Sequence, residues 1–363
     1  MFSNYPRSLD FKNIAYTVAE LVTNTTESPY PNLEMNSPPG GPIDYSTYPA
    51  KGANYHDYLI GVQSVVIDAK DRLWILDTGR ALTPDGTNVP ASYGGPKLIG
   101  VNLSNNSVFQ TIVFPPTVAY SVSYLNDVRF DLRPNVTSSG QGVAYITDSS
   151  NEGRNGLVIV DLGTGISWRH LDGLPQVHPA AQFIKSIWGE TVYSYSSTSS
   201  AQQISYETTG ADGIALSADG STLFFAPVSN RYLYSIPTSY LLDHSPGSEL
   251  RAQSAVVSRG QKGCSDGLET DSNDAIYGGD LEQNAVNIFF PSNDTTEVFV
   301  RDPRIGWTDT MSIATIAGKG WLYFTENQLW RSPMYAPGTD RRVKPYVLFR
   351  APLPAGGTKV LLT

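Results

Sequence analysis

The sequence predicts an all-β fold, a six-bladed β-propeller that forms one domain over residues 1–363. Three observations lead to this prediction. A strand–turn–strand pattern recurs five times, helical periodicity is almost absent, and the composition of 32 glycines, 25 prolines and 21 tyrosines suits short strands joined by tight turns. The apolar fraction of 40% is sufficient for the large core that such a fold needs.

The repeated unit has the same order of features in all five copies. A polar residue comes first and a short apolar strand follows. A turn rich in Asp, Gly or Asn then leads into a second strand that carries an aromatic residue. The copies are Gly61–Gly79, Leu125–Ser150, Ala211–Ser229, Ser265–Asp280 and Thr308–Asn327. The longest interval separates the second copy from the third, and we expect it to hold one blade plus an insertion over Trp168–Glu207.

Each second strand is expected to pack between neighbouring blades. The bulky residues that would fill the wedge are Trp74, Tyr145, Phe224, Tyr277 and Tyr323. The sixth blade would combine the N-terminal segment with the C-terminal strands Tyr346–Arg350 and Lys359–Leu362, which closes the ring and removes the sheet edge. Only the stretch Thr238–Asp243 reads as a short helical turn.

Composition and missing motifs exclude several classes of function. The net charge is −9, and the only basic cluster is Arg341, Arg342 and Lys344, so nucleic acid is not an expected partner. No apolar run approaches the roughly 20 residues that span a bilayer, so no membrane association is expected. There is no phosphate loop or dinucleotide fingerprint, so we expect no redox or nucleotide cofactor. Nothing in the sequence indicates an oligomeric state.

One short motif suggests nucleophilic catalysis and is rejected. Gly263–Gly267 (GCSDG) matches the nucleophile elbow of serine hydrolases, but the elbow joins a strand to a helix, and this segment opens a predicted strand. All four histidines precede Ser265, against the hydrolase order. The single cysteine, Cys264, cannot form a disulfide within the chain, and we expect it to be a buried, inert thiol.

Several copies resemble the yellow/major royal jelly protein family, and the fungal branch in particular. Ser64–Gly79 (SVVIDAKDRLWILDTG) resembles the family signature, and Ala144–Asp148 (AYITD) resembles its next blade. Leu157–Arg169 and Asp212–Phe225 resemble later segments, so the likeness runs from about Gly61 to Arg331. Insect members carry paired cysteines, whereas this chain has one. The resemblance implies the propeller fold. Some fungal propellers of this general type are implicated in natural-product cyclisations, including the hetero-Diels–Alder joining of a polyketide to a terpene.

The polar residues that open the copies are the candidate site. They are Gln63, Asn126, Asp212, Asp266 and Asp309, with Asp127 beside Asn126, and we expect them to converge at one end of the channel. Related lactonase-type propellers hold a divalent cation there, and oxygen ligands suit Ca²⁺. Asn126 and Asp266 fit that pattern, but Asp212 replaces the usual Asn and a first-blade Glu is missing. Three interpretations stay open: a metal site, a metal-free polar floor beneath a ligand, and residues that only cap strand ends. We predict that a tightly bound catalytic metal is absent.

Aromatic residues near these positions are candidates for the wall of a pocket. Tyr124 and Trp307 each precede a polar opening residue by two positions, and Trp188 lies in the insertion. His178, in PQVHP, is a further candidate beside the same pocket, although a role in a surface loop is equally compatible with its position. A pocket of this kind suits a small, apolar, oxygenated ligand.

Three functions remain open. The first is a cofactor-independent cyclase, of the hetero-Diels–Alder type, or an isomerase, with Asn126, Asp212, Asp266 and Asp309 as catalytic residues. The second is a non-catalytic protein that binds a small ligand, as some members of the resembled family do. The third is a divalent-metal lactonase or hydrolase. The absence of nucleophile motifs favours the first.

Five glycosylation sequons and the family resemblance favour a secreted or secretory-lumen location. The sequons are at Asn24, Asn102, Asn105, Asn135 and Asn293. The first residues contain no signal-peptide core, so we expect a signal peptide to have been removed from the mature form.

Overall fold

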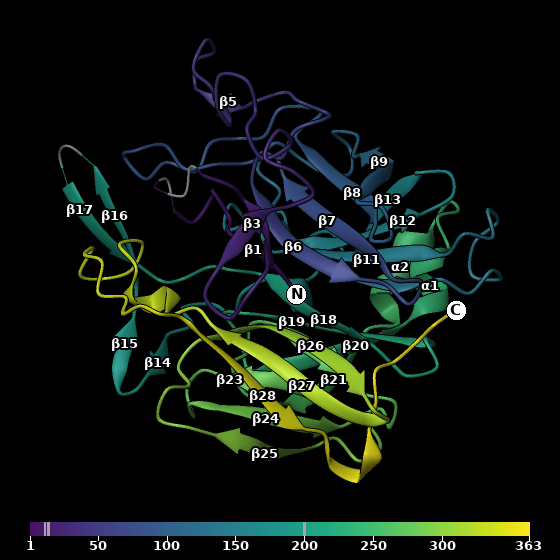
Figure 1. Ribbon diagram of the computed structural model, residues 1–363. Coiled ribbons are helices and arrows are strands. Elements are labelled where there is room, and N and C mark those ends of the chain that lie inside the picture. The colour runs from purple at the N-terminus through teal and green to yellow at the C-terminus, as the bar shows by residue number, and fades with distance from the viewer. Residues whose placement is uncertain (11, 13–14, 199–200) are drawn as a thin grey trace. The chain divides into compact units, whose positions relative to one another are not determined.

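The chain folds almost entirely into short antiparallel β-sheets in the computed structural model, which describes residues 1–10, 12, 15–198 and 201–363 (Figure 1). Four sheets have four strands each, β6–β9, β10–β13, β18–β21 and β22–β25, and two have three, β1–β3 and β26–β28. These six sheets are the blades of a β-propeller. Helix accounts for about 6% of the chain, so the predicted all-β class is confirmed.

Internal contacts group the residues into two compact units. The N-terminal unit is Met1–Arg154 and Val158–Arg169 with Thr363, and the C-terminal unit is Asn155–Leu157 and His170–Leu362. The prediction that residues 1–363 form one domain stays a prediction.

The N-terminal unit holds three of the six sheets for most of their length. Its strands are β1 (Phe2–Asn4), β2 (Val18–Leu21), β3 (Glu27–Pro29), β4 (Ile43–Asp44), β5 (Lys51–Gly52), β6 (Val62–Ile67), β7 (Arg72–Thr78), β8 (Pro96–Asn102), β9 (Ser107–Val113), β10 (Leu125–Asp131), β11 (Val143–Asp148), β12 (Gly156–Asp161) and β13 (Ser167–His170). The short pair β4–β5 stands apart from the six sheets.

The C-terminal unit holds the other three sheets and the helices. Its elements are η1 (Pro175–Val177), β14 (Lys185–Ile187), β15 (Glu190–Val192), β16 (Ser194–Thr198), β17 (Ala201–Ser205), β18 (Ala211–Leu216), β19 (Thr222–Pro227), β20 (Tyr232–Pro237), α1 (Thr238–Leu242), α2 (Ser248–Ser254), β21 (Val257–Gln261), β22 (Leu268–Thr270), β23 (Ile276–Asp280), β24 (Ala285–Phe290), β25 (Thr295–Arg301), β26 (Thr308–Ile316), β27 (Lys319–Glu326), η2 (Leu329–Arg331), β28 (Val347–Pro352) and η3 (Pro354–Gly356). The predicted helical turn is α1, and α2 was not predicted.

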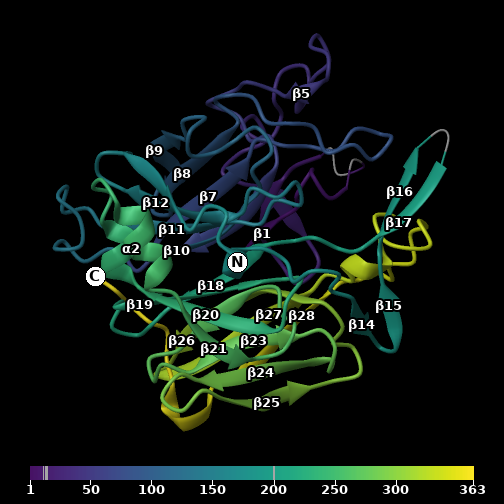
Figure 2. The same cartoon turned by 180° about the vertical axis from the view of Figure 1, so that it is seen from behind.

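Each copy of the repeat forms the first two strands of one sheet. The copies correspond in order to β6–β7, β10–β11, β18–β19, β22–β23 and β26–β27. The predicted insertion contains two hairpins, β14–β15 and β16–β17, that belong to none of the six sheets. Hairpin β16–β17 lies beside the segment that follows η2, where the Tyr195 N–H donates to the Met334 carbonyl (Figures 1 and 2).

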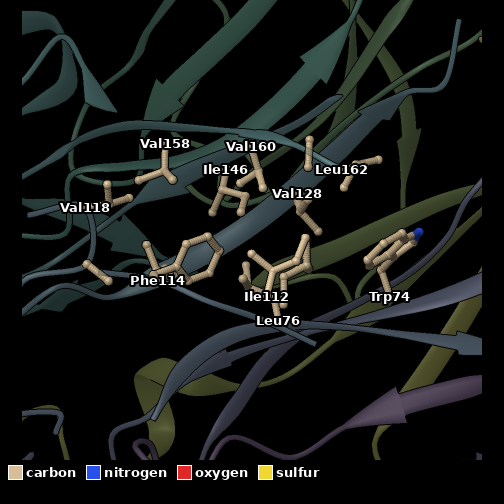
Figure 3. Packing of buried hydrophobic residues seen from close by; sticks show 14 of the residues in the cluster. Trp74, Leu76, Ile112, Phe114, Val118, Val128, Ile146, Val158, Val160 and Leu162 are labelled. Atoms are coloured by element: carbon tan, nitrogen blue, oxygen red, sulfur yellow. The ribbon is translucent and has the colours of Figure 1, made fainter. Parts of the chain in front are cut away.

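Two of the five predicted aromatic residues, Trp74 and Tyr277, pack between sheets, whereas Tyr323 is only half-buried. Trp74 of β7 is fully buried in a cluster that includes Val128 and Ile146 of the next sheet (Figure 3). Tyr277 of β23 is equally buried in a cluster with Leu322 of β27. A bulky ring therefore fills the wedge between neighbouring sheets in each unit.

The predicted closure of the sixth blade is wrong. The C-terminal strand β28 pairs with β27, whereas the N-terminal strands β1–β3 form a sheet of their own. Lys359 makes only an isolated bridge to Asp271. The physical reason is that β27 has a free edge on the side away from β26, and β28 satisfies its backbone groups along its whole length, from Glu326↔Val347 to Trp321↔Pro352.

A buried carboxylate closes the first hairpin of several sheets. Asp77, near the end of β7, accepts hydrogen bonds from the backbone N–H of Ile60 (2.7 Å) and Gly61 (2.9 Å), just before β6. Asp148, at the end of β11, accepts one from Tyr124 (2.8 Å), just before β10. Both are neutralised by buried cations of the same sheet, Lys97 at 3.1 Å from Asp77 and Arg169 at 2.8 Å from Asp148. These strand-end carboxylates fix where each sheet begins.

We expect Asp77→Asn to lower the free energy of unfolding by about 3–5 kcal/mol, because it leaves the Lys97 ammonium buried without its counter-charge. Both side chains of the pair are 0% exposed. Urea denaturation measures the change. The control is Asp302→Asn, which breaks the Asp302–Arg304 pair, in which Arg304 is exposed and Asp302 partly exposed, and which should change stability by less than about 1 kcal/mol. Equal effects of the two substitutions would contradict the role given to Asp77.

Candidate functional site

The predicted polar opening residues lie at irregularities where the first strands begin. The β6–β7 register shifts between Val62 and Ser64, leaving Gln63 as the extra residue. Equivalent shifts enclose Asn126 and Asp127 in β10, Asp212 in β18, and Asp309 in β26. Asp266 lies two residues before β22. Because a β-bulge re-aims a side chain out of the regular alternation, these sheets present polar groups at equivalent points.

In the N-terminal unit, three of the predicted residues form one hydrogen-bonded chain. The Tyr124 hydroxyl donates to Gln63 Oε1 (2.7 Å), and Gln63 Nε2 donates to Asn126 Oδ1 (3.2 Å). Asn126 Nδ2 then donates to Ser149 Oγ (2.8 Å), and Ser8 Oγ lies 2.6 Å from the Tyr124 hydroxyl. All three predicted residues are half-buried, so the chain keeps some access to solvent. Their role in binding a ligand stays a prediction.

Asp127 has a different environment from its neighbour Asn126. Its Oδ1 accepts from the Val128 N–H and from the Arg129 guanidinium, both at 2.9 Å. Burial raises the pKa of Asp127 in spite of the charge of Arg129. A carboxyl of this kind holds its proton at a higher pH than an exposed aspartic acid does.

In the C-terminal unit, close backbone approaches bring three of the predicted aspartates to adjacent strands. A Cβ at Gly213 would lie 2.3 Å from the carbonyl oxygen of Asp266, and one at Gly267 would lie 2.3 Å from that of Asp309. Only glycine fits at such distances. The starts of β18, β22 and β26 therefore pack backbone against backbone, and the aspartates that flank these glycines are neighbours.

Asp212 and Asp266 are hydrogen-bonded to each other through their side chains. Ionised carboxylates only accept hydrogen bonds, so this contact requires one proton shared by the pair. The Trp307 indole N–H donates to Asp266 Oδ2 at 2.6 Å. Burial raises the pKa of Asp266, and the hydrogen bonds from Trp307 and Asp212 partly offset that rise. Both residues are buried, with 4% of Asp212 and 6% of Asp266 exposed.

A buried ion pair, which the sequence did not predict, supports the carboxyl pair. Lys185 Nζ lies 2.8 Å from Glu207 Oε2 and 4.4 Å from the centre of the Trp307 ring. Burial alone would lower the pKa of Lys185, but the charge of Glu207 more than offsets it, and the pKa of Lys185 is raised. The one sequence signal for this ion pair is that charged residues are scarce in the insertion. The sequence does not show which of them pair, because Lys185 and Glu207 are 22 positions apart.

The remaining predicted residues lie in several surroundings. Asp309 is half-buried and accepts a hydrogen bond from Asn327 Nδ2 (2.9 Å). His178 follows η1, and its Nδ1 lies 2.8 Å from Asn155 Oδ1. Trp188 occupies the turn between β14 and β15, where it is 50% exposed and donates to the Ile305 carbonyl (2.9 Å). The convergence of these residues and the N-terminal chain on one channel end stays a prediction.

The prediction that Trp307 forms an open pocket wall is wrong. Its side chain is 1% exposed, with Lys185 on its ring and Tyr335 packed against it at 5.5 Å between ring centres. The physical reason is that the insertion brings Lys185 over the ring, while the indole N–H is engaged by Asp266. Trp307 therefore orients a carboxyl and packs in the core.

The segment GCSDG contains no accessible nucleophile. Ser265 is 1% exposed, and its hydroxyl contacts Lys262 Nζ. It lies just before strand β22, whereas a nucleophile elbow leads from a strand into a helix. Burial lowers the pKa of Lys262 to about 8. Cys264 is fully buried and donates to the Val228 carbonyl, and burial raises its pKa to about 12. A thiol held neutral in this way is a poor nucleophile.

Two further structural observations concern metals and membranes. Within the described residues, no group of three or more His, Cys, Asp or Glu side chains is arranged to hold a metal ion. In the same residues, no helix is long and apolar enough to cross a bilayer.

Comparison with known proteins identifies the family. The family profile described as major royal jelly protein matches residues 60–348, while no curated protein matches the sequence. Similar solved structures include a gluconolactonase of Xanthomonas campestris (12% identity, 75% of this chain and 71% of that chain, TM-score 0.40). Another is the calcium-binding protein regucalcin of Agrobacterium tumefaciens (15%, 73% and 81%, TM-score 0.40). A third is a luciferin-regenerating enzyme (11%, 83% and 93%, TM-score 0.46). Likenesses this distant carry no argument about activity. Because the profile covers most of its length, this chain belongs to the major royal jelly protein family.

Proposed function

We propose that this protein is a cofactor-independent enzyme that transfers protons on a small, apolar, oxygenated substrate, in an isomerisation or a cyclisation. The observation that carries the proposal is the contact of two buried carboxyls, Asp212 and Asp266, with the Trp307 indole N–H donating to Asp266 at 2.6 Å. We take this pair to hold one proton. Two carboxyls in this state offer one general acid and one general base at the same point.

The proposed step balances within the pair. The ionised carboxyl removes a proton from the carbon next to a carbonyl group, while the neutral carboxyl donates its proton to the carbonyl oxygen. The product is an enol, and the pair again holds one proton. Return of a proton at another carbon gives an isomer. In a cyclisation, the hydrogen bond from the neutral carboxyl would instead stabilise negative charge that develops on the carbonyl oxygen.

Asp309, which is half-buried and lies on the strand next to the pair, suits a polar group of such a substrate. We place a substrate hydroxyl group against Asp309 as part of the proposal. The hydrogen-bonded chain of Tyr124, Gln63 and Asn126 in the N-terminal unit is a separate candidate for ligand binding. Non-catalytic binding of the same ligand, and a metal-dependent hydrolysis, are the alternatives that the experiments below separate.

We expect catalysed exchange of deuterium from heavy water into carbon positions next to carbonyl groups in a panel of cyclic diketones and hydroxy-enones. Mass spectrometry reads the exchange without knowledge of the natural product. Asp266→Asn and Asp212→Asn should each lower the rate by about 10²–10⁴-fold, the usual contribution of general acid–base catalysis. The rate should be highest at intermediate pH, because the pair works only with one proton bound.

The matched control is Asp302→Asn, a partly exposed aspartate outside the site, which should exchange at the wild-type rate. Treatment with EDTA should also leave the rate unchanged. Binding of panel compounds without exchange would favour the non-catalytic alternative, and loss of activity on chelation, restored by Ca²⁺, would favour the metal-dependent one.

Substitution of Trp307 separates its packing role from its role toward Asp266. Trp307→Ala should lower the free energy of unfolding by about 3–5 kcal/mol, because it empties a fully buried indole site. Trp307→Phe keeps most of the ring and removes only the N–H. The lost hydrogen bond had lowered the pKa of Asp266, so the pH optimum of exchange should move upward. An unchanged optimum in Trp307→Phe would show that the indole does not act on the pair.

We further propose that the protein is secreted and glycosylated. Asn24, Asn105, Asn135 and Asn293 are exposed. When a eukaryotic host secretes the protein, endoglycosidase should lower its mass. Absence of any mass change would contradict this location.

A further inference from the structure

Glu326 differs from its counterparts in the N-terminal unit. It ends β27 as Asp77 and Asp148 end their second strands, and it accepts a hydrogen bond from the Trp307 N–H at 2.6 Å, just before β26. The other two carboxylates face a buried Lys or Arg of their own sheet. Glu326 is 3% exposed, and within the described residues its Oε2 has no hydrogen-bond partner. Its buried charge therefore has weaker compensation.

The surroundings of Glu326 explain its titration. Burial raises the pKa of Glu326 to about 7, and the backbone N–H groups of Gly306 and Trp307 and the charge of Arg331 only partly oppose this. Two charged residues lie on the elements next to Glu326. Arg331 belongs to η2, and Asp309 follows Thr308, which pairs with Glu326 in the sheet. The charged residues around Trp307 are Lys185, Glu207 and Asp266.

A continuous set of contacts links Glu326 to the carboxyl pair. Glu326 holds the backbone N–H of Trp307, and the indole of the same residue donates to Asp266, which is bonded to Asp212. Trp307 is 1% exposed and packed among Lys185 and Tyr335, so its backbone and its ring are held together as one rigid piece.

We propose that Glu326 is a positioning residue for the Asp212–Asp266 pair, and that its charge state adjusts the hydrogen bond from Trp307 to Asp266. An ionised Glu326 holds the Trp307 N–H with a charge-assisted bond, and protonation weakens that bond. The turn before β26 then relaxes, and the indole moves relative to Asp266. The effect of Glu326 on catalysis rests on the proposed function, whereas its effect on the hydrogen bond from Trp307 to Asp266 does not.

The test uses full-length protein labelled with ¹⁵N at tryptophan only, which gives a backbone and an indole resonance for each of its 6 tryptophans. Trp307→Phe identifies the two resonances of Trp307. In the wild type, both should shift on titration from about pH 5 to about pH 9, with a common midpoint near 7. Glu326→Gln, which retains the carbonyl acceptor, should abolish the backbone shift and the part of the indole shift that shares its midpoint, and leave only the indole shift caused by titration of Asp266.

The control is Glu297→Gln, a substitution at an exposed position of β25, which should titrate as the wild type does. A backbone resonance that titrates without a component of the same midpoint in the indole resonance would overturn the proposal, and so would an unchanged indole titration in Glu326→Gln. The first comparison is made in wild-type protein, so it decides the matter even if the variant fails to fold.

The outcomes distinguish this proposal from the proposed function. If the indole shift depends on Glu326 but no deuterium exchange is catalysed, the positioning link stands and the enzyme proposal fails. If the carboxyl pair catalyses exchange and the indole is indifferent to Glu326, the enzyme proposal stands and the positioning link fails.

Discussion

The hydrogen bond from the backbone N–H before a first strand to a buried carboxylate at the end of the second strand is the constraint on which the site depends. Asp77, Asp148 and Glu326 each make it, with donor–acceptor distances of 2.7, 2.8 and 2.6 Å to Ile60, Tyr124 and Trp307. A buried charge is tolerated only with compensation, so the sheets that carry Asp77 and Asp148 also supply a buried cation. This contact sets the point at which each sheet leaves the preceding loop.

Placement of the polar residues follows from the bulges. The extra residue at the start of the first strand is turned out of the regular alternation. It is Gln63 in the β6–β9 sheet and Asp212 in the β18–β21 sheet, and Asp309 lies within the corresponding bulge of the β26–β28 sheet. In the C-terminal unit, Gly213 and Gly267 allow neighbouring starts to touch. Two carboxyls, Asp212 and Asp266, then come into contact, and this contact is the basis of the proposed proton transfer.

Much of the fold could be predicted because its signals are local. The five copies of the repeat predict which strands pair. The aromatic residue in a copy predicts packing between sheets, and Trp74 and Tyr277 confirm it. The strand-end carboxylates Asp77, Asp148 and Glu326 share a sequence signal as well, since an acid follows the aromatic residue by three positions in WILD, YITD and YFTE. Helix α2 was missed because its sequence, SELRAQS, has no apolar stripe.

The parts that could not be predicted depend on contacts between distant residues. Proximity in sequence to Asp309 suggested that Trp307 lines a pocket, but Lys185, more than a hundred residues earlier, covers its ring. The partner of β28 was equally hidden, because an irregular segment separates it from β27 and sequence pattern does not say which free edge a terminal strand will choose.

The most direct test of this account is the protonation state of the carboxyl pair itself. Protein labelled with ¹³C at the aspartate carboxyls, titrated by NMR with Asp266→Asn and Asp212→Asn for assignment, reports each carboxyl separately. The account predicts that the pair retains one proton at a pH above the ordinary titration range of aspartic acid, because burial raises the pKa of Asp266. Independent ionisation of Asp212 and Asp266 near pH 4, as for exposed aspartates, would contradict it.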